Sequence, residues 1–179
     1  MKEGEAAVLI RECLQGNQES FAELLKQHQK QVFNVAYRLL CNYEDARDVT
    51  QSVFLKAYES LASFDCRLRF FSWIYRIAVN ESINYLKSRR RHEDIDEAIA
   101  EERNTPETLL HATEVGREIQ RGLMSMAVDL RIVVVLRHFH HCSYRDIAEI
   151  TEIPEKTVKS RLFTARNQLR EYLSGKGVL

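Results

Sequence analysis

The chain has 179 residues, of which 45% are hydrophobic, and its 26 basic residues are balanced by 26 acidic ones. The hydrophobic content excludes a chain that is disordered throughout, and the zero net charge gives no support for a nucleic-acid partner. Two prolines and six glycines are too few for a turn-rich β protein, so we expect mainly helix.

Targeting and membrane signals are missing from the sequence. No apolar run approaches the roughly 20 residues of a membrane-spanning helix, and the N-terminus has no basic-then-apolar pattern. The four cysteines contain no CxxC pair. We therefore expect a protein of the reducing cytoplasm, without membrane insertion.

Two helices are expected in the first third of the chain. Apolar residues recur at spacings of four and three from Phe21 to Leu39, which predicts one buried helical face. Asn42 can cap a second helix, and Glu44 and Asp45 suit the positive N-terminal end of that helix. The buried side of that helix would consist of Ala46, Val49, Val53 and Ala57.

An aromatic and basic segment follows at residues 64–75, "FDCRLRFFSWIY". Its rings could contact bases or pack in a core, and for Phe71 and Trp73 we favour the core. In the helix expected next, Ile74, Ala78 and Tyr85 lie on one side. Its other side carries Arg76, Asn80, Ile83, Lys87 and Arg90 in one narrow sector.

A change of charge marks a linker. Residues 87–91 read "KSRRR", whereas residues 92–118 contain nine acidic side chains against Arg103 and Arg117, a net charge of −7. Such a segment favours a solvated connection that repels anions.

Residues 129–139, "DLRIVVVLRHF", have β-branched residues that suit a strand, but helical spacing and the lack of a hairpin partner favour a helix. If the helix continued, His138, His141 and Cys142 would share a face on which zinc could be held with one water. Surface histidines at a helix end are the favoured alternative, so we expect no metal and no cofactor.

Residues 143–162, "SYRDIAEITEIPEKTVKSRL", predict two helices joined by a short turn. Ser143 and Asp146 form a capping box, which starts a helix at Tyr144. Pro154 suits the first position of the next helix. Between them, Glu152 would take a left-handed conformation, at a cost of about 1 kcal/mol relative to glycine.

This helix-turn-helix would expose cations and hydroxyls that suit a DNA major groove. The alternative is that the two helices only pack together and that the cations face water. The exposed face would consist of Lys156, Thr157, Lys159, Ser160, Arg161 and Thr164.

Three blocks of this sequence, residues 43–64, 70–91 and 130–173, resemble in order and spacing the extracytoplasmic-function sigma factors of bacterial RNA polymerase. The resemblance implies an all-α fold with two small helical domains. Residues 1–92 would be sigma region two, residues 93–116 a flexible acidic linker, and residues 117–179 sigma region four. It also implies a function: to direct core RNA polymerase to specific promoters and to assist their opening, in a stress or envelope response under anti-sigma control.

The resemblance further implies roles for individual residues. Ser52 stands where the family usually has an acid, and Thr164 stands where it frequently has arginine, so the chain departs from the family pattern at these two positions. The minus-ten element would be bound by Phe64, Arg67, Arg69, Arg76, Asn80, Ile83, Lys87, Arg89 and Arg90, and the minus-thirty-five element by Lys156, Thr157, Lys159, Ser160, Arg161, Phe163, Thr164 and Arg166. Contacts to the polymerase, at the β′ clamp helices, would come from Asp45, Asp48, Gln51, Ser52 and Leu55, and the β flap is a further expected partner site.

Other classes of function remain open at this point. A stand-alone helix-turn-helix regulator would bind a palindrome as a dimer without polymerase. A helical adaptor would leave the cations of "KSRRR" and "KTVKSR" without a target. An enzyme is disfavoured, because the sequence has no glycine-rich phosphate loop, no HExxH and no nucleophile elbow, so we expect no catalytic residue.

Overall fold

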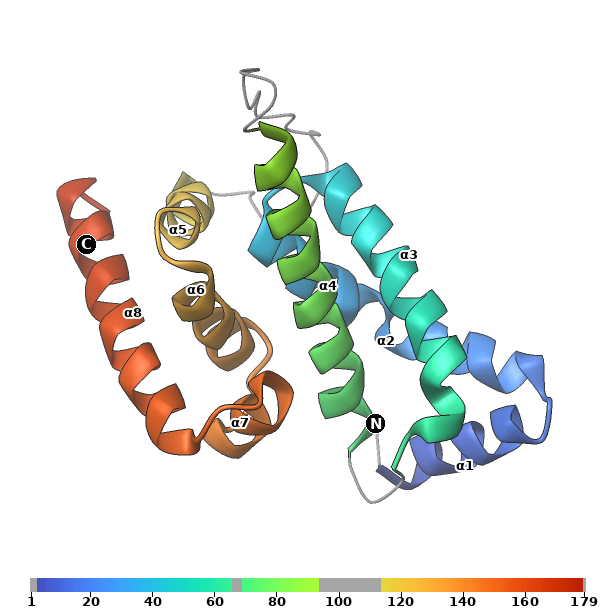
Figure 1. The fold of residues 1–179 in the computed structure, drawn as a ribbon. Helices are drawn as coiled ribbons and strands as arrows, with labels where there is room; N and C mark the ends of the chain where they lie inside the picture. The colour runs from blue at the N-terminus through green and yellow to red at the C-terminus, as the bar shows by residue number, and fades with distance from the viewer. Residues whose placement is uncertain (1–2, 66–68, 94–113, 179) are drawn as a thin grey trace.

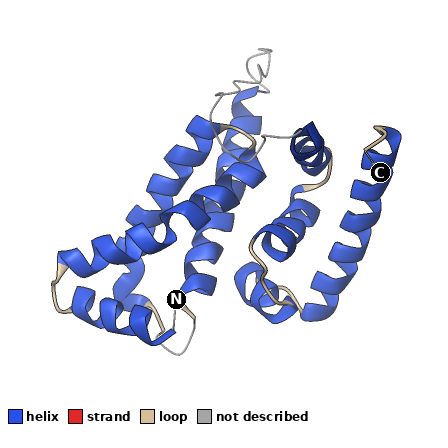
Figure 2. Cartoon of the chain, turned by 180° about the vertical axis from the view of Figure 1, so that it is seen from behind, coloured by secondary structure: helices blue, strands red, loops and turns tan. Residues whose placement is uncertain are grey.

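The computed structural model describes residues 3–65, 69–93 and 114–178, and every regular element within these ranges is a helix (Figures 1 and 2). The all-α fold with two helical modules predicted from the sequence is confirmed. Arg67 and nearly all of the expected acidic linker lie outside the described residues. In the part of the chain that the structure describes, no helix combines the length and the hydropathy of a bilayer span.

The first module consists of four helices and a short 3-10 turn. Helix α1 (Glu3–Leu14) packs on α2 (Gln18–Leu40), and α2 packs on α3 (Tyr43–Ser60). The turn η1 (Leu61–Ser63) leads towards α4 (Phe70–Glu93), which contacts both α2 and α3. The predicted stripes are confirmed as core, since Val32, Val35, Ala46, Val53 and Ala57 are fully buried.

Side-chain caps set the helix starts in this module. The carboxamide oxygen of Asn42 accepts a hydrogen bond of 3.1 Å from the main-chain N–H of Asp45, as the sequence predicts. Asn17 accepts in the same way from the N–H groups of Glu19 and Ser20 at the start of α2. These bonds satisfy amide groups that have no partner within the helix.

The second module contains the other helices. Helix α5 (Glu114–Met124) and helix α6 (Val128–Val134) are followed by a π-helical turn, η2 (Val135–Phe139). Helix α7 (Tyr144–Thr151) and helix α8 (Glu155–Gly175) complete it, and α8 packs against α5, α6 and α7. The helical interpretation of residues 129–139 is therefore confirmed.

Helices α7 and α8 form the expected helix-turn-helix. The capping box at Ser143 and Asp146 is present, and Glu152 has the left-handed conformation with φ 56°. Pro154 lies one position earlier than expected: it is the N-cap of α8, with ψ 145°, and the helix begins at Glu155. Because ψ of Pro154 is extended, Ile153 and Pro154 belong to the turn and not to α8.

The two modules pack against each other, chiefly through α4 and α7, so that α4 lies between α3 and the second module (Figure 1). Buried polar groups cross the interface. Arg38 Nη1 donates to Gln120 Oε1 at 2.9 Å, and Gln120 Nε2 donates back to the carbonyl oxygen of Arg38 at 3.1 Å. Tyr75 and His140 are joined by a hydrogen bond of 3.1 Å between the phenol oxygen and Nδ1.

Candidate nucleic-acid interface

The exposed face of α4 contains a hollow beside Asn80. Asn80 is exposed, and the hollow lies between α3 and α4. At its edge Lys56 Nζ donates to Glu81 Oε1 at 2.6 Å. A carboxamide offers both a donor and an acceptor, so Asn80 can pair with the edge of an unpaired base. The hollow is lined by Lys56, Glu59, Ser60, Ile77, Asn80 and Glu81.

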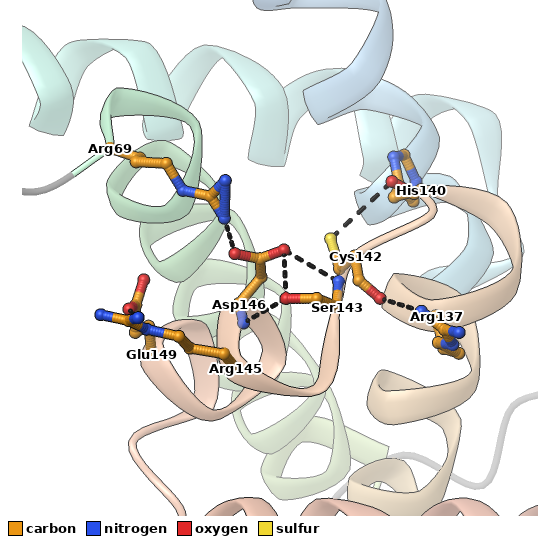
Figure 3. A network of polar contacts seen from close by, with 8 residues as sticks. All are labelled: Arg69, Arg137, His140, Cys142, Ser143, Arg145, Asp146 and Glu149. Carbon is orange, nitrogen blue, oxygen red and sulfur yellow. Dashed lines mark hydrogen bonds and ion pairs between the residues drawn. The ribbon is translucent and has the colours of Figure 1, made fainter. Parts of the chain in front are cut away.

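Two arginines, Arg69 immediately before α4 and Arg76 in its second turn, contact the second module. The guanidinium of Arg69 forms an ion pair with the buried carboxylate of Asp146 (Figure 3). Arg76 Nη1 donates to Glu152 Oε1 at 3.0 Å, and its Nη2 donates to the carbonyl oxygen of Glu149 at 2.5 Å. Two of the predicted DNA contacts of the first module are thus occupied by groups of the second module.

The aromatic segment forms a packed cluster. Phe64 is only 9% exposed, and its ring centroid lies 5.0 Å from that of Trp73 and 5.8 Å from that of Phe70. Phe71 and Trp73 are partly buried against the core, as favoured from the sequence. Base stacking by Phe64 stays a prediction, and it would start from a ring that is engaged with its neighbours.

The C-terminal half of α4 brings together residues to which the resemblance gives different roles. Arg89 Nη1 lies 3.5 Å from Asp45 Oδ2, so an expected phosphate contact pairs with an expected polymerase contact. Burial, and then a hydrogen bond with Asp45, raise the pKa of Tyr85 to about 12. Lys87 is exposed and Ile83 is half-buried, and the side chain of Arg90 is not among those described.

Helix α8 lies along the outer edge of the molecule (Figures 1 and 2), and several polar side chains in its first half are exposed. Phe163 is 68% exposed, although its neighbour Leu162 is buried. Arg161 is half-buried and its Nη2 lies 3.2 Å from Asp129 Oδ2, while Arg166 Nε donates to His138 Nε2 at 3.2 Å. Among the predicted residues of α8, Thr157 is half-buried, and Lys156, Lys159, Ser160, Thr164 and Arg166 are exposed.

The outer face of α3 combines polar and apolar groups. Asp48, Gln51 and Ser52 are exposed, and Leu55 is 61% exposed. Sequence reasoning missed Tyr58, which is 52% exposed. Its spacing of three from Leu55 was the available signal, since residues three apart lie on one helix face.

A second hollow between α2 and α3 was also missed. Lys26, Lys30 and Arg47 give it a cationic rim, and Phe33 and Tyr43 form its apolar part. Lys26 and Lys30 are four residues apart on α2, so only their shared face was readable from the sequence.

The histidines near residue 140 do not share one helical face, because the helix ends at Phe139 and His141 has φ 55°. Among the described residues no group of three His, Cys, Asp or Glu side chains is arranged to hold a metal ion. Burial, with the charges of Arg38 and His141, lowers the pKa of His140 to about 4.

Comparison with known proteins agrees with the division of the chain into two modules. The Sigma-70 region 2 family model matches residues 24–92, and the Sigma-70, region 4 model matches residues 116–169. The ECF RNA polymerase sigma-E factor of Escherichia coli (strain K12) is 35% identical over 174 residues, which is 90% of this chain and 91% of that protein. The ECF RNA polymerase sigma factor SigW of Bacillus subtilis (strain 168) is 29% identical over 176 residues, 92% of this chain and 94% of that protein.

Solved structures agree on the fold. The sigma factor RpoE of Bartonella quintana, in complex with the anti-sigma factor NepR, has a TM-score of 0.76 and 25% identity, covering 87% of this chain and 98% of that one. CnrH in complex with the cytosolic domain of CnrY has a TM-score of 0.74 and 22% identity, covering 96% and 98%. With two matching family models and relatives at 35% identity over nine tenths of its length, the chain belongs to the extracytoplasmic-function (ECF) sigma factors of the sigma-70 family.

Proposed function

We propose that this chain is the sigma subunit that directs core RNA polymerase to specific promoters and assists their opening. The observation that supports this most is the pairing of two modules with different exposed surfaces, a hollow beside Asn80 on α4 and the polar face of α8. Residues 1–92 would serve as region two and residues 117–179 as region four. Residues 93–116 would connect them as an acidic linker that avoids the DNA.

The first module would bind the unpaired minus-ten element. Unpairing a base costs a few kcal/mol, which stacking and hydrogen bonds to its edge can offset. The exposed carboxamide of Asn80 supports a base-edge role, with Lys56 and Ser60 beside it in the same hollow. The phosphate contacts would come from Arg67, Arg69, Arg76, Lys87, Arg89 and Arg90.

The second module would place α8 in the major groove of the minus-thirty-five element. Lys159 and Ser160 are exposed on this helix, and lysine can meet phosphates or guanine edges while serine can serve either. The exposed Phe163 ring suits apolar contact with a thymine methyl group. Arg161 would have to leave Asp129 before it could contact DNA.

The polymerase contacts would lie on α3. The exposed Leu55 and Tyr58 form an apolar pair bordered by Asp48, Gln51 and Ser52, which suits docking on the β′ clamp helices. The β flap would contact the second module. In this role the chain works by binding rather than by catalysis, and in the cytoplasm, where its polymerase is.

Regulation by an anti-sigma protein is part of the proposal. Its support is the likeness, at 25% identity and a TM-score of 0.76, to a sigma factor solved with its anti-sigma factor. That likeness extends over both modules, so an anti-sigma protein would bind this chain with the modules packed together.

Reconstitution with core polymerase tests the proposed function. Transcripts from a genomic template would be sequenced at their 5′ ends, and we expect start sites that share two upstream elements. Start sites without shared elements would reject the sigma role. A palindromic footprint by the chain alone would instead favour a dimeric helix-turn-helix regulator.

A further inference from the structure

The contact between α4 and α7 engages two of the arginines that the proposed function assigns to promoter DNA. Arg69 pairs with Asp146, whose side chain is 8% exposed (Figure 3). Arg76 is held twice, by the carboxylate of Glu152 and by the carbonyl oxygen of Glu149. Both terminal nitrogens of Arg76 thus donate within the protein and its Nε is buried, so the two-bond fork that a guanidinium forms on a phosphate is not available in this packing.

The geometry at Arg76 fits the end of a helix. Glu149 lies in the last turn of α7, where carbonyl oxygens lack partners within the helix and the helix dipole is negative. Glu152, the residue after the helix, adds a full negative charge at the same place. Carboxylate and carbonyl oxygens of α7 therefore occupy the positions around Arg76 that phosphate oxygens would take.

The contact is selective for one of the two DNA-binding surfaces. Helix α8 lies on the outer edge of the molecule, away from α4, in both views (Figures 1 and 2). Lys156, Lys159, Ser160 and Phe163 are exposed while the modules are packed together. Asn80 and Lys87 are exposed as well, so the packing engages two of the proposed phosphate contacts, Arg69 and Arg76, and leaves the base-reading group open.

We infer that Asp146, Glu152 and the Glu149 carbonyl form an internal latch, an autoinhibitory contact that replaces DNA phosphates at Arg69 and Arg76 in the free chain. The inference rests on the proposed function, which assigns both arginines to promoter DNA. It predicts that the free chain binds single-stranded DNA weakly while α8 stays open to duplex. Separation of the modules, as on a polymerase that holds two promoter elements apart, releases both arginines.

Charge reversal at Glu152 tests the latch in the full-length chain. Glu152→Arg repels Arg76, and the Glu152 side chain is 68% exposed, so the fold should tolerate it. Glu171→Arg is the matched control, because it makes the same charge change at an exposed site near the far end of α8. Circular dichroism checks both folds, and Glu152→Gln replaces the reversal if Glu152→Arg does not fold.

Two measurements follow, small-angle X-ray scattering of the free chain and fluorescence anisotropy with labelled DNA. The probes are a mixed-sequence 12-nucleotide single strand and a mixed-sequence 20-base-pair duplex, since phosphate contacts are independent of sequence. For Glu152→Arg we expect a larger radius of gyration and about fivefold tighter single-strand binding than for Glu171→Arg, the most that a pair of this exposure carries. Duplex binding should be equal in the two variants.

A second substitution tests whether Arg76 supplies the added single-strand affinity. Arg76→Ala in the Glu152→Arg background should remove the added single-strand affinity but keep the larger radius of gyration. Equal single-strand binding by Glu152→Arg and Glu171→Arg would overturn the latch. If that result came with normal promoter-specific transcription, only the latch would fall, whereas loss of specific start sites in the unaltered chain would reject the proposed function.

Discussion

Arg131 Nη1 donates a hydrogen bond of 2.5 Å to the carbonyl oxygen of Leu39, so a side chain of the second module closes the C-terminal end of α2. The same guanidinium donates to the carbonyl oxygens of Leu123, Met124 and Met126, at and just beyond the end of α5. Arg131 is 5% exposed. A single buried cation thus joins the negative ends of two helices from different modules.

Replacing Arg131 with Met should destabilise the whole chain. The change leaves buried carbonyl oxygens without a donor, and we expect the free energy of unfolding to fall by about 3 kcal/mol. Urea denaturation followed by circular dichroism measures this. Arg117→Met, at an exposed position of α5, is the control and should change it by less than about 0.5 kcal/mol. Similar stabilities for the two variants would contradict the bridging role.

Asn80→Ala should impair reading of the minus-ten element. A good base-edge contact carries about 1–3 kcal/mol, so open-complex formation should fall roughly tenfold, with thermal stability unchanged because Asn80 is exposed. Run-off transcription with reconstituted polymerase measures the effect. Asn84→Ala, one turn further along α4 and also exposed, should transcribe normally. If both variants were equally active, base reading by Asn80 would be wrong.

Lys159→Ala should weaken duplex binding by α8. The loss of one phosphate contact lowers affinity for all sequences and reduces the slope of log K against log[salt] by about one. Anisotropy titrations at several salt concentrations give this slope. Lys176→Ala, beyond the end of α8, should leave it unchanged, and an equal change in both would mean that α8 has no special contact at Lys159.

Leu55→Asp should weaken binding to core polymerase. The leucine is 61% exposed beside Tyr58, so a charge there adds a desolvation cost to docking without disturbing the fold. We expect at least about tenfold weaker association, which biolayer interferometry with core polymerase can follow. Val115→Asp places the same charge at a 50% exposed position of α5 and should bind normally. Normal binding by Leu55→Asp would remove α3 from the polymerase interface.

Packing of the modules should depend on pH through His140. Its pKa is lowered to about 4 by burial and by Arg38 and His141, and Tyr75 is its hydrogen-bond partner. A depressed histidine pKa means that the stabilisation is complete above the unfolded value near 6.5 and is lost as the pH falls towards 4. Between pH 7 and pH 5, this effect of His140 should lower the free energy of unfolding by about 2 kcal/mol.

The pH prediction has its own control. His140→Gln should lose less stability than the unaltered chain over the same pH range, by about 2 kcal/mol. His28 and His138 also have lowered pKa values through burial, so the comparison must use the difference between the two chains. Identical pH profiles would show that His140 does not titrate in this window.

Local signals made much of the fold predictable. The Asn42 cap and the box formed by Ser143 and Asp146 could be read directly, because a capping residue and its partner lie within three positions. The position of Pro154 was wrong by one residue, since an extended proline suits an N-cap as well as its fixed φ suits the first turn.

The contacts between modules could not be predicted. Arg38 and Gln120 are 82 positions apart, and nothing in either neighbourhood distinguishes a buried pair joined by two reciprocal hydrogen bonds from two surface residues. Arg76 shows the same limit, because its place on the cationic face of α4 was evident but its partners at Glu149 and Glu152 were not. Periodicity gives the face of a helix and not the element that covers it.

Two requirements conflict at Glu152: the left-handed backbone of the turn favours glycine, whereas the contact with Arg76 needs a carboxylate. Glycine there would relax the turn of the second module by about 1 kcal/mol, but it would also remove the carboxylate that Arg76 contacts. An isolated second module with glycine at this position should therefore melt at a higher temperature, while the complete chain should spend more time with its halves apart. Selection for thermal resistance of the second module alone would therefore favour a sigma factor in which the two modules are held together less tightly.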